Sequence, residues 1–368
     1  AARNEWESFQ VLTRTEAEVK GINVEPGDLK GPGGAVIRAA EARLYRQHQL
    51  ELREPTSRND SFKPGWYPDA LIPFRHPLTK QPLAGARFTA VPFDLPANET
   101  HGFWVDILVP ADAKAGEYRG SYRVTAPGQK PVTLNVSLTV WDFALPDMLT
   151  MQTALGSPAE RMRGYYAKLA KAGKETAPQD WSAVEAQVAD EVSRLRINAT
   201  PPRETLTPVR QADGSWRVPP EQIEALRKFV DTYHINAVQA PHPNSAVKDP
   251  EAEREKLHAW LKAFDRAAVE LQRPQVTFFC YLKDEPNDEE EYRYVQKWGG
   301  AVTSAKSALK TMVVEQTKTQ DEKWGDLYGA VDIWCPLFPL HDEKTAAERM
   351  AAGEKVWCYT ALCQRNPT

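Results

Sequence analysis

Two adjacent carboxylates, Asp284 and Glu285, are the most conspicuous chemical feature of the sequence, within the segment YLKDEPND (Tyr281 to Asp288). Neighbouring residues of a regular strand point to opposite faces, so both can address one pocket only where the pleat breaks. Pro286 favours such a break, because a proline disfavours helical geometry at the preceding residue and ends the strand. Two carboxylates in one confined site split their affinities for a proton, which gives an acid beside an anion. Hydrolysis of a glycosidic bond needs both groups.

The acidic residues that follow this pair have a structural explanation. The run Asp288 to Glu291 is typical of a helix N-cap followed by an acidic first turn, which the helix dipole favours. Asn287 could bind sugar hydroxyls or simply cap the same helix. For Asp284 and Glu285, position alone leaves catalysis and a structural role equally open.

Further candidates lie where predicted strands end, and each has a structural alternative. His242 and Asn244, in the segment APHPN, could contact a sugar or belong to an ordinary loop, and the same holds for Glu315. Three aromatic side chains could form the apolar platform on which a sugar ring stacks, or could pack inside the domain: Trp334, Trp357 and Tyr359.

The elements that must position these residues follow a strand–helix alternation over residues 148–368. We expect seven strands, which end near Ser157, Pro201, His242, Asp284, Gln316, Pro336 and Thr360. Sequential βα units without a GxGxxG loop favour a (β/α)8 TIM-type barrel, whose active site lies at the carboxyl ends of the strands. The region is shorter than the about 250 residues of such a barrel. We therefore expect that the chain lacks the last βα unit and that the natural protein continues.

Residues 1–147 predict a different architecture, a β-sandwich domain. The segment Phe103 to Val109 is a mostly apolar strand, and Val132 to Val140 alternates apolar and polar residues. Gly116, Gly120 and the Pro127-Gly128 pair mark turns between them, and no long amphipathic helix is apparent. Short strands joined by regular turns favour a sandwich.

Composition excludes several classes of protein. The chain of 368 residues carries 46 Lys and Arg against 50 Asp and Glu, so it lacks the basic surface of a nucleic-acid-binding protein. No apolar run reaches the about 20 residues of a membrane span. There is no HExxH, CxxC or paired-histidine spacing, so we expect no metal and no cofactor.

The chain also resembles a known family, the glycoside hydrolase family 123-like proteins. The resemblance rests on six segments: AARNEWESFQ at the start, YPDALIPF (Tyr67 to Phe74), PADAKAGEYRG (Pro110 to Gly120), VWDFALP (Val140 to Pro146), YLKDEPND and VDIWCP. Characterised members are β-N-acetylgalactosaminidases with an adjacent Asp-Glu pair and a substrate-assisted, retaining mechanism.

The resemblance implies a role for each member of the pair. Glu285 would be the general acid/base, and Asp284 would orient the substrate's 2-acetamido group, whose oxygen attacks the anomeric carbon. Tyr281 would donate to that oxygen, with a core tyrosine as the alternative. The resemblance also favours a carbohydrate substrate and an exported bacterial protein.

Two other functions stay open at this point. One is a glycosidase for a sugar without an acetamido group, in which a carboxylate of another strand, such as Glu315, works beside the pair. About 5–5.5 Å between the two carboxyl groups would support that reaction. The other is a carbohydrate-binding protein without catalysis.

Overall fold

The computed structural model describes residues 1–54, 63–83, 85–174, 178, 180–201 and 205–361. Over these residues the fold mixes α-helices with several β-sheets. The chain divides into two compact units, and the division falls between Asp147 and Met148. No helix in the described ranges is both long and apolar enough to cross a membrane.

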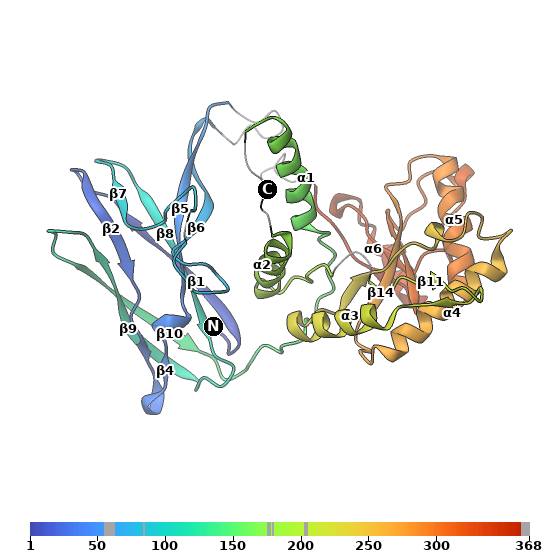
Figure 1. The fold of residues 1–368 in the computed structure, drawn as a ribbon, viewed down its shortest axis with the longest axis horizontal. Helices are drawn as coiled ribbons and strands as arrows, with labels where there is room; N and C mark the ends of the chain where they lie inside the picture. The colour runs from blue at the N-terminus through green and yellow to red at the C-terminus, as the bar shows by residue number, and fades with distance from the viewer. Residues whose placement is uncertain (55–62, 84, 175–177, 179, 202–204, 362–368) are drawn as a thin grey trace. The chain divides into compact units, whose positions relative to one another are not determined.

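The first unit consists of two sheets (Figure 1). One has the order β1-β8-β5-β6, formed by Glu5–Thr13, His101–Val109, Arg43–Leu52 and Gly65–Pro73. The other has the order β4-β3-β9-β2-β7, formed by Val36–Ile37, Leu29–Lys30, Gly116–Thr125, Val19–Glu25 and Phe93–Leu95, with β10 (Val132–Val140) paired to β9. Its helical turns are η1 (Pro32–Gly34) and η2 (Ala39–Glu41).

Alternating side chains explain why this unit forms a sheet protein. On β8, Phe103, Val105, Ile107 and Val109 are buried, as the period of two requires. They pack in one core with residues of the second sheet such as Tyr118. The predicted strands Phe103 to Val109 and Val132 to Val140 are therefore confirmed.

The second unit is built on a parallel sheet in which chain order and spatial order agree, β13-β14-β15-β16-β17. Its strands are Ala237–Gln239, Thr277–Asp284, Leu309–Val314, Ile333–Trp334 and Lys355–Val356. The α-helices are α1 (Pro158–Lys171), α2 (Trp181–Arg194), α3 (Pro220–Tyr233), α4 (Arg254–Glu270), α5 (Glu289–Ser304) and α6 (Glu343–Ala351). Smaller elements are β11 (Val209–Arg210), β12 (Trp216–Arg217), η3 (Pro243–Ser245), η4 (Glu322–Trp324) and η5 (Phe338–Leu340).

The two faces of this sheet carry different cores. Side chains of one face, such as Phe278 and Val313, pack with helical residues such as Trp260 in a large cluster. The alternate residues form a smaller cluster of Ala237, Phe279, Met312, Val314, Ile333 and Cys335, against which Tyr281, Trp357 and Tyr359 pack. The period of two thus places three aromatic side chains on the face turned away from the helices.

Two of the seven expected strands are not strands in the described structure. The segments ending near Ser157 and Pro201 have no backbone ladder. Side-chain amides connect them instead: Asn198 donates to the Thr153 carbonyl (3.2 Å) and to Asn236 Oδ1 (3.0 Å). The described parallel sheet therefore has five strands and does not by itself establish a barrel.

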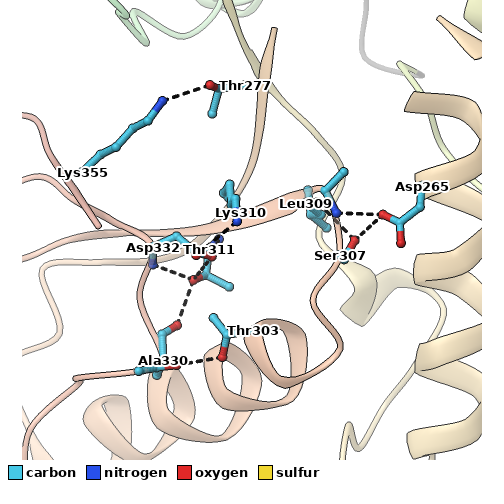
Figure 2. Close-up of polar contacts among 12 residues, drawn as sticks. Asp265, Thr277, Thr303, Ser307, Leu309, Lys310, Thr311, Ala330, Asp332 and Lys355 are labelled. Atoms are coloured by element: carbon cyan, nitrogen blue, oxygen red, sulfur yellow. Dashed lines mark hydrogen bonds and ion pairs between the residues drawn. The ribbon is translucent and has the colours of Figure 1, made fainter. Parts of the chain in front are cut away.

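The amino-terminal edge of the sheet is fixed by polar contacts, which Figure 2 shows. The Thr311 hydroxyl donates to the Ala330 carbonyl (2.9 Å), and the Thr311 amide donates to Asp332 Oδ2 (2.9 Å). Lys355 Nζ, on the last strand, donates to Thr277 Oγ1 on the second (3.1 Å). Polar groups of the protein thus bind one another at the amino-terminal ends of the strands. The candidate site lies at the opposite, carboxyl-terminal ends, which we call the carboxyl edge of the sheet.

Candidate active site

A β-bulge near the end of β14 brings the two carboxylates out of a regular pleat. Tyr281 pairs with Met312, but Lys283 pairs with the very next residue, Val313, so that Leu282 is inserted. A bulge bends the strand and changes the direction of the side chains that follow. Glu285 comes directly after Asp284, the last residue of this strand. The break in the pleat that the pair requires is therefore present.

The backbone of Glu285 is in the left-handed region, with a φ of 41°. For a non-glycine residue this conformation costs about 1–3 kcal/mol and persists only where the surroundings impose it. The Glu285 amide donates to the Val314 carbonyl (3.0 Å), and its carbonyl accepts from the Asn287 side chain. The Asn287 side chain thus caps the turn, and the Asn287 backbone N–H donates to Glu291 Oε2 (2.8 Å).

Each carboxylate of the pair has its own phenol donor. The Tyr281 hydroxyl donates to Asp284 Oδ1 (2.7 Å), and the Tyr359 hydroxyl donates to Glu285 Oε1. Burial, and next the hydrogen bond to the carboxylate, raise the pKa of both tyrosines well above the ordinary value. Both phenols therefore remain protonated donors over the working range of an enzyme. Asp284 and Glu285 are themselves exposed, so the pair is open to a ligand.

Glu315 directly follows the next strand, β15, and is buried, with 6% of its surface exposed. Its Oε1 accepts from the Gln316 amide (2.9 Å) and its Oε2 from Gln320 Nε2 (2.8 Å). Burial raises the pKa of Glu315 to about 7, and the charge of Glu285 acts in the same direction. A carboxyl group so enclosed has little surface left for a sugar, which disfavours the direct substrate contact expected of Glu315.

His242 and Asn244 form a separate cluster after β13. His242 Nδ1 accepts from the Asn244 amide (3.0 Å), and the imidazole ring lies edge-on against Trp298 (4.9 Å between centroids). Burial lowers the pKa of His242 to about 4, so the ring is neutral at physiological pH. Asn244 Nδ2 donates to the Tyr294 hydroxyl (3.3 Å). These contacts cap the turn at η3 and give both residues a structural role, and their contact with a sugar stays a prediction.

The three aromatic residues predicted to form a sugar platform lie on two different faces of the parallel sheet. Trp334 is 1% exposed within the helix-side core, where its indole donates to Glu354 Oε2 (2.6 Å). It has no ring face to offer, because its position on β16 points toward the helices. Trp357 is half-buried on the other face, edge-on to Phe279 (5.3 Å), and Tyr359 lies on that same face.

Two further residues lie at this edge without a clear sequence signal. Gln320 connects the Glu285 turn to Glu315, since its amide also donates to the Pro286 carbonyl (3.1 Å). Phe338, in η5, is 62% exposed, and its amide donates to the Tyr359 carbonyl (2.8 Å). A glutamine in a polar loop and a phenylalanine between two prolines carry no recognisable spacing.

Comparison with known proteins gives a family for the first unit. Residues 1–126 match the glycoside hydrolase 123 N-terminal domain. The whole chain is similar to the solved structure of a family 123 glycoside hydrolase from Clostridium perfringens, which was determined in work on glycolipid glycan hydrolysis. The TM-score is 0.59 at 13% identity, and the match covers 98% of this chain and 67% of that one.

Other solved structures are similar to the chain only weakly. A GH5 xyloglucanase from Bacteroides ovatus matches with a TM-score of 0.21 and 8% identity, over 92% of this chain and 69% of that one. A family 2 glycosyl hydrolase from Bacteroides cellulosilyticus matches with 0.29 and 10%, over 95% and 41%. No curated protein matches the chain. The resemblance to family 123 is nevertheless confirmed, and this relationship supports glycosidase activity and a carbohydrate substrate.

Proposed function

We propose that the chain is an exo-acting β-N-acetylhexosaminidase, with N-acetylgalactosamine the favoured sugar, that works by retaining, substrate-assisted catalysis. One observation carries the proposal: two adjacent exposed carboxylates at the carboxyl edge of a parallel sheet each accept a hydrogen bond from a separate tyrosine. Ligands of parallel α/β sheets bind at that edge. The similar Clostridium perfringens enzyme, whose study concerns glycolipid glycans, supports a glycan as the substrate.

The proposed first step uses Glu285 as the acid. Its carboxyl proton passes to the glycosidic oxygen while the bond from that oxygen to the anomeric carbon breaks. The carbonyl oxygen of the substrate's 2-acetamido group attacks the same carbon from the opposite face. The Tyr359 hydroxyl holds one Glu285 oxygen, which leaves the other free to face the leaving group.

Asp284 acts on the acetamido group in this proposal. An ionised carboxylate that accepts the acetamido N–H stabilises the positive charge that develops as the oxazolinium ring forms. Tyr281 fixes the Asp284 carboxylate through its hydroxyl at 2.7 Å, and in this proposal the same phenol donates to the acetamido oxygen. In the second step Glu285 takes a proton from water, which attacks the anomeric carbon and opens the ring with net retention.

The burial of Glu315 disfavours direct attack by a carboxylate of another strand. A nucleophile must be ionised and reach the sugar, whereas Glu315 has both oxygens hydrogen bonded inside the protein. The substrate's own acetamido group is the nucleophile that this arrangement leaves available. We therefore place the alternative glycosidase, for sugars without an acetamido group, second.

We also propose an arrangement of domains for this function. The catalytic domain comprises residues 148–368 and is a (β/α)8 barrel, which the strictly sequential parallel order of β13 to β17 supports. The sandwich domain comprises residues 1–147.

The experiment is hydrolysis of 4-nitrophenyl β-glycosides of GalNAc, GlcNAc and galactose. We expect cleavage of the acetamido sugars only, with inhibition by a GalNAc thiazoline that mimics the bicyclic intermediate. Asp284→Asn and Glu285→Gln should each lower kcat by roughly 10²-fold or more. Glu290→Gln, which replaces an exposed acid in the first turn of α5, is the matched control. Equal cleavage of the galactoside would refute the substrate-assisted mechanism.

A further inference from the structure

The loop after β15 reaches back to the turn that carries Glu285. Gln320 Nε2 donates to the Pro286 carbonyl (3.1 Å) and to Glu315 Oε2 (2.8 Å). A single amide group therefore ties the residue directly after the proposed acid to a buried carboxyl group at the end of the neighbouring strand. Pro286 is itself buried, so its carbonyl needs a partner from the protein.

This contact acts on a backbone that is under strain. Glu285 has a left-handed φ, which the chain adopts only where surrounding bonds hold it. The Val314 carbonyl and the Asn287 side chain hold Glu285 itself, and Asn287 belongs to the same turn. Gln320 is the side chain that joins this turn to the loop after β15.

We propose that Gln320 is a positioning residue which, anchored on Glu315, fixes the Glu285–Pro286 turn so that the Glu285 carboxyl group meets the glycosidic oxygen. The inference rests on the proposed function of Glu285. A displacement of about 1 Å in a catalytic group lowers the rate by about 10²-fold. Gln320 holds the turn through one of several bonds, so its removal should produce a smaller loss than removal of the acid.

Glu315 also lies among other titratable and polar groups. They include Glu285 directly after β14, Tyr292 on α5 and the amides of Gln316 and Gln320. Burial and the charge of Glu285 raise the pKa of Glu315, whereas the hydrogen bond from Gln320 lowers it.

The kinetic test compares Gln320→Ala with Lys318→Ala, an exposed side chain of the same loop. We expect kcat of Gln320→Ala to fall by roughly 10- to 30-fold, with KM within about twofold and an unchanged melting temperature. Lys318→Ala should behave as the wild type. If Gln320→Ala keeps the wild-type kcat while the wild type cleaves the GalNAc glycoside, the positioning role is wrong and the proposed function stands.

A second measurement tests the contact without any activity. The carboxyl carbon of Glu315, labelled with 13C and assigned by its loss in Glu315→Gln, is titrated by NMR in the wild type and in Gln320→Ala. Loss of a donor to the ionised carboxylate should raise the titration midpoint in Gln320→Ala above the wild-type pKa of about 7. Identical midpoints would overturn the contact on which the proposal depends.

Discussion

Tyr281→Phe is the most informative single substitution, because it removes one oxygen and leaves the ring in place. The lost hydroxyl donates to Asp284 Oδ1 at 2.7 Å. The ring packs on the small cluster with Phe279 and Met312, and phenylalanine preserves those contacts. The effect should therefore appear in catalysis and leave stability nearly unchanged.

The size of the effect follows from the type of bond. A hydrogen bond to a charged group contributes about 1.5–3 kcal/mol. At 1.36 kcal/mol for each tenfold change, its loss in the transition state lowers kcat by roughly 10- to 150-fold. Tyr294→Phe is the matched control, because the Tyr294 hydroxyl makes only long contacts, 3.3 Å to Asn244 and 3.4 Å to His242.

The assay is kcat for the nitrophenyl β-GalNAc glycoside in a double-mutant cycle with Asp284→Asn. If Tyr281 acts through Asp284, its removal should cost less than about threefold once Asp284 has been replaced, because residues in contact are not additive. A kcat for Tyr281→Phe within twofold of the wild type would refute the reasoning. A full additional loss in the Asp284→Asn background would show that Tyr281 acts on the substrate independently.

Three further predictions concern stability. Glu285→Gly should be more stable than Glu285→Ala by about 1 kcal/mol in urea unfolding, since glycine tolerates the left-handed backbone; equal stabilities would remove the argument from strain. His242 has a pKa of about 4 in the folded protein against about 6.5 in the unfolded chain. Its contribution to the free energy of unfolding should therefore be complete above pH 6.5, and up to about 3 kcal/mol of it should be lost as the pH falls to 4. Glu315 contributes in the opposite direction, because the stability that its raised pKa provides is lost as the pH rises from about 4.5 to 7. The free energy of unfolding is therefore measured against pH in Glu315→Gln, with and without His242→Gln. Parallel curves for these two proteins would contradict the prediction. Phe264→Ala should lower the free energy of unfolding by about 3–5 kcal/mol, because the side chain is fully buried against Trp260, and a loss below 1 kcal/mol would contradict close packing there.

Much of the fold could be predicted because its elements have strong periodicity. The helix face of Ile223, Leu226 and Val230 is buried on α3, and Asp288 caps α5 by accepting from the Glu291 amide. The two expected strands near Ser157 and Pro201 were wrong for the described residues. Their apolar residues are too few to distinguish a ladder from an extended segment held by asparagine side chains.

The candidate site was only partly accessible to sequence reasoning. Carboxylates before a proline suggest a strand end, but only the three-dimensional register shows the bulge at Leu282. Ile333 and Cys335 lie on the other face of the sheet from Trp334, as the period of two requires. This alternation could have excluded Trp334 from the sugar platform only if the sequence had shown which face each residue occupies. Gln320 could not be found, because its role depends on two contacts made across strands.

The two phenol donors differ greatly in their distance along the chain from the carboxylates they serve. Tyr281 is 3 residues from Asp284, whereas Tyr359 is 74 residues from Glu285. In a chimera of two relatives, a crossover between residues 286 and 358 therefore takes Glu285 from one parent and Tyr359 from the other. Asp284 and its donor Tyr281 still come from the same parent. Such hybrids should fail selectively at proton transfer to the leaving group, and libraries that place crossovers before β14 or after Tyr359 should retain far more active members.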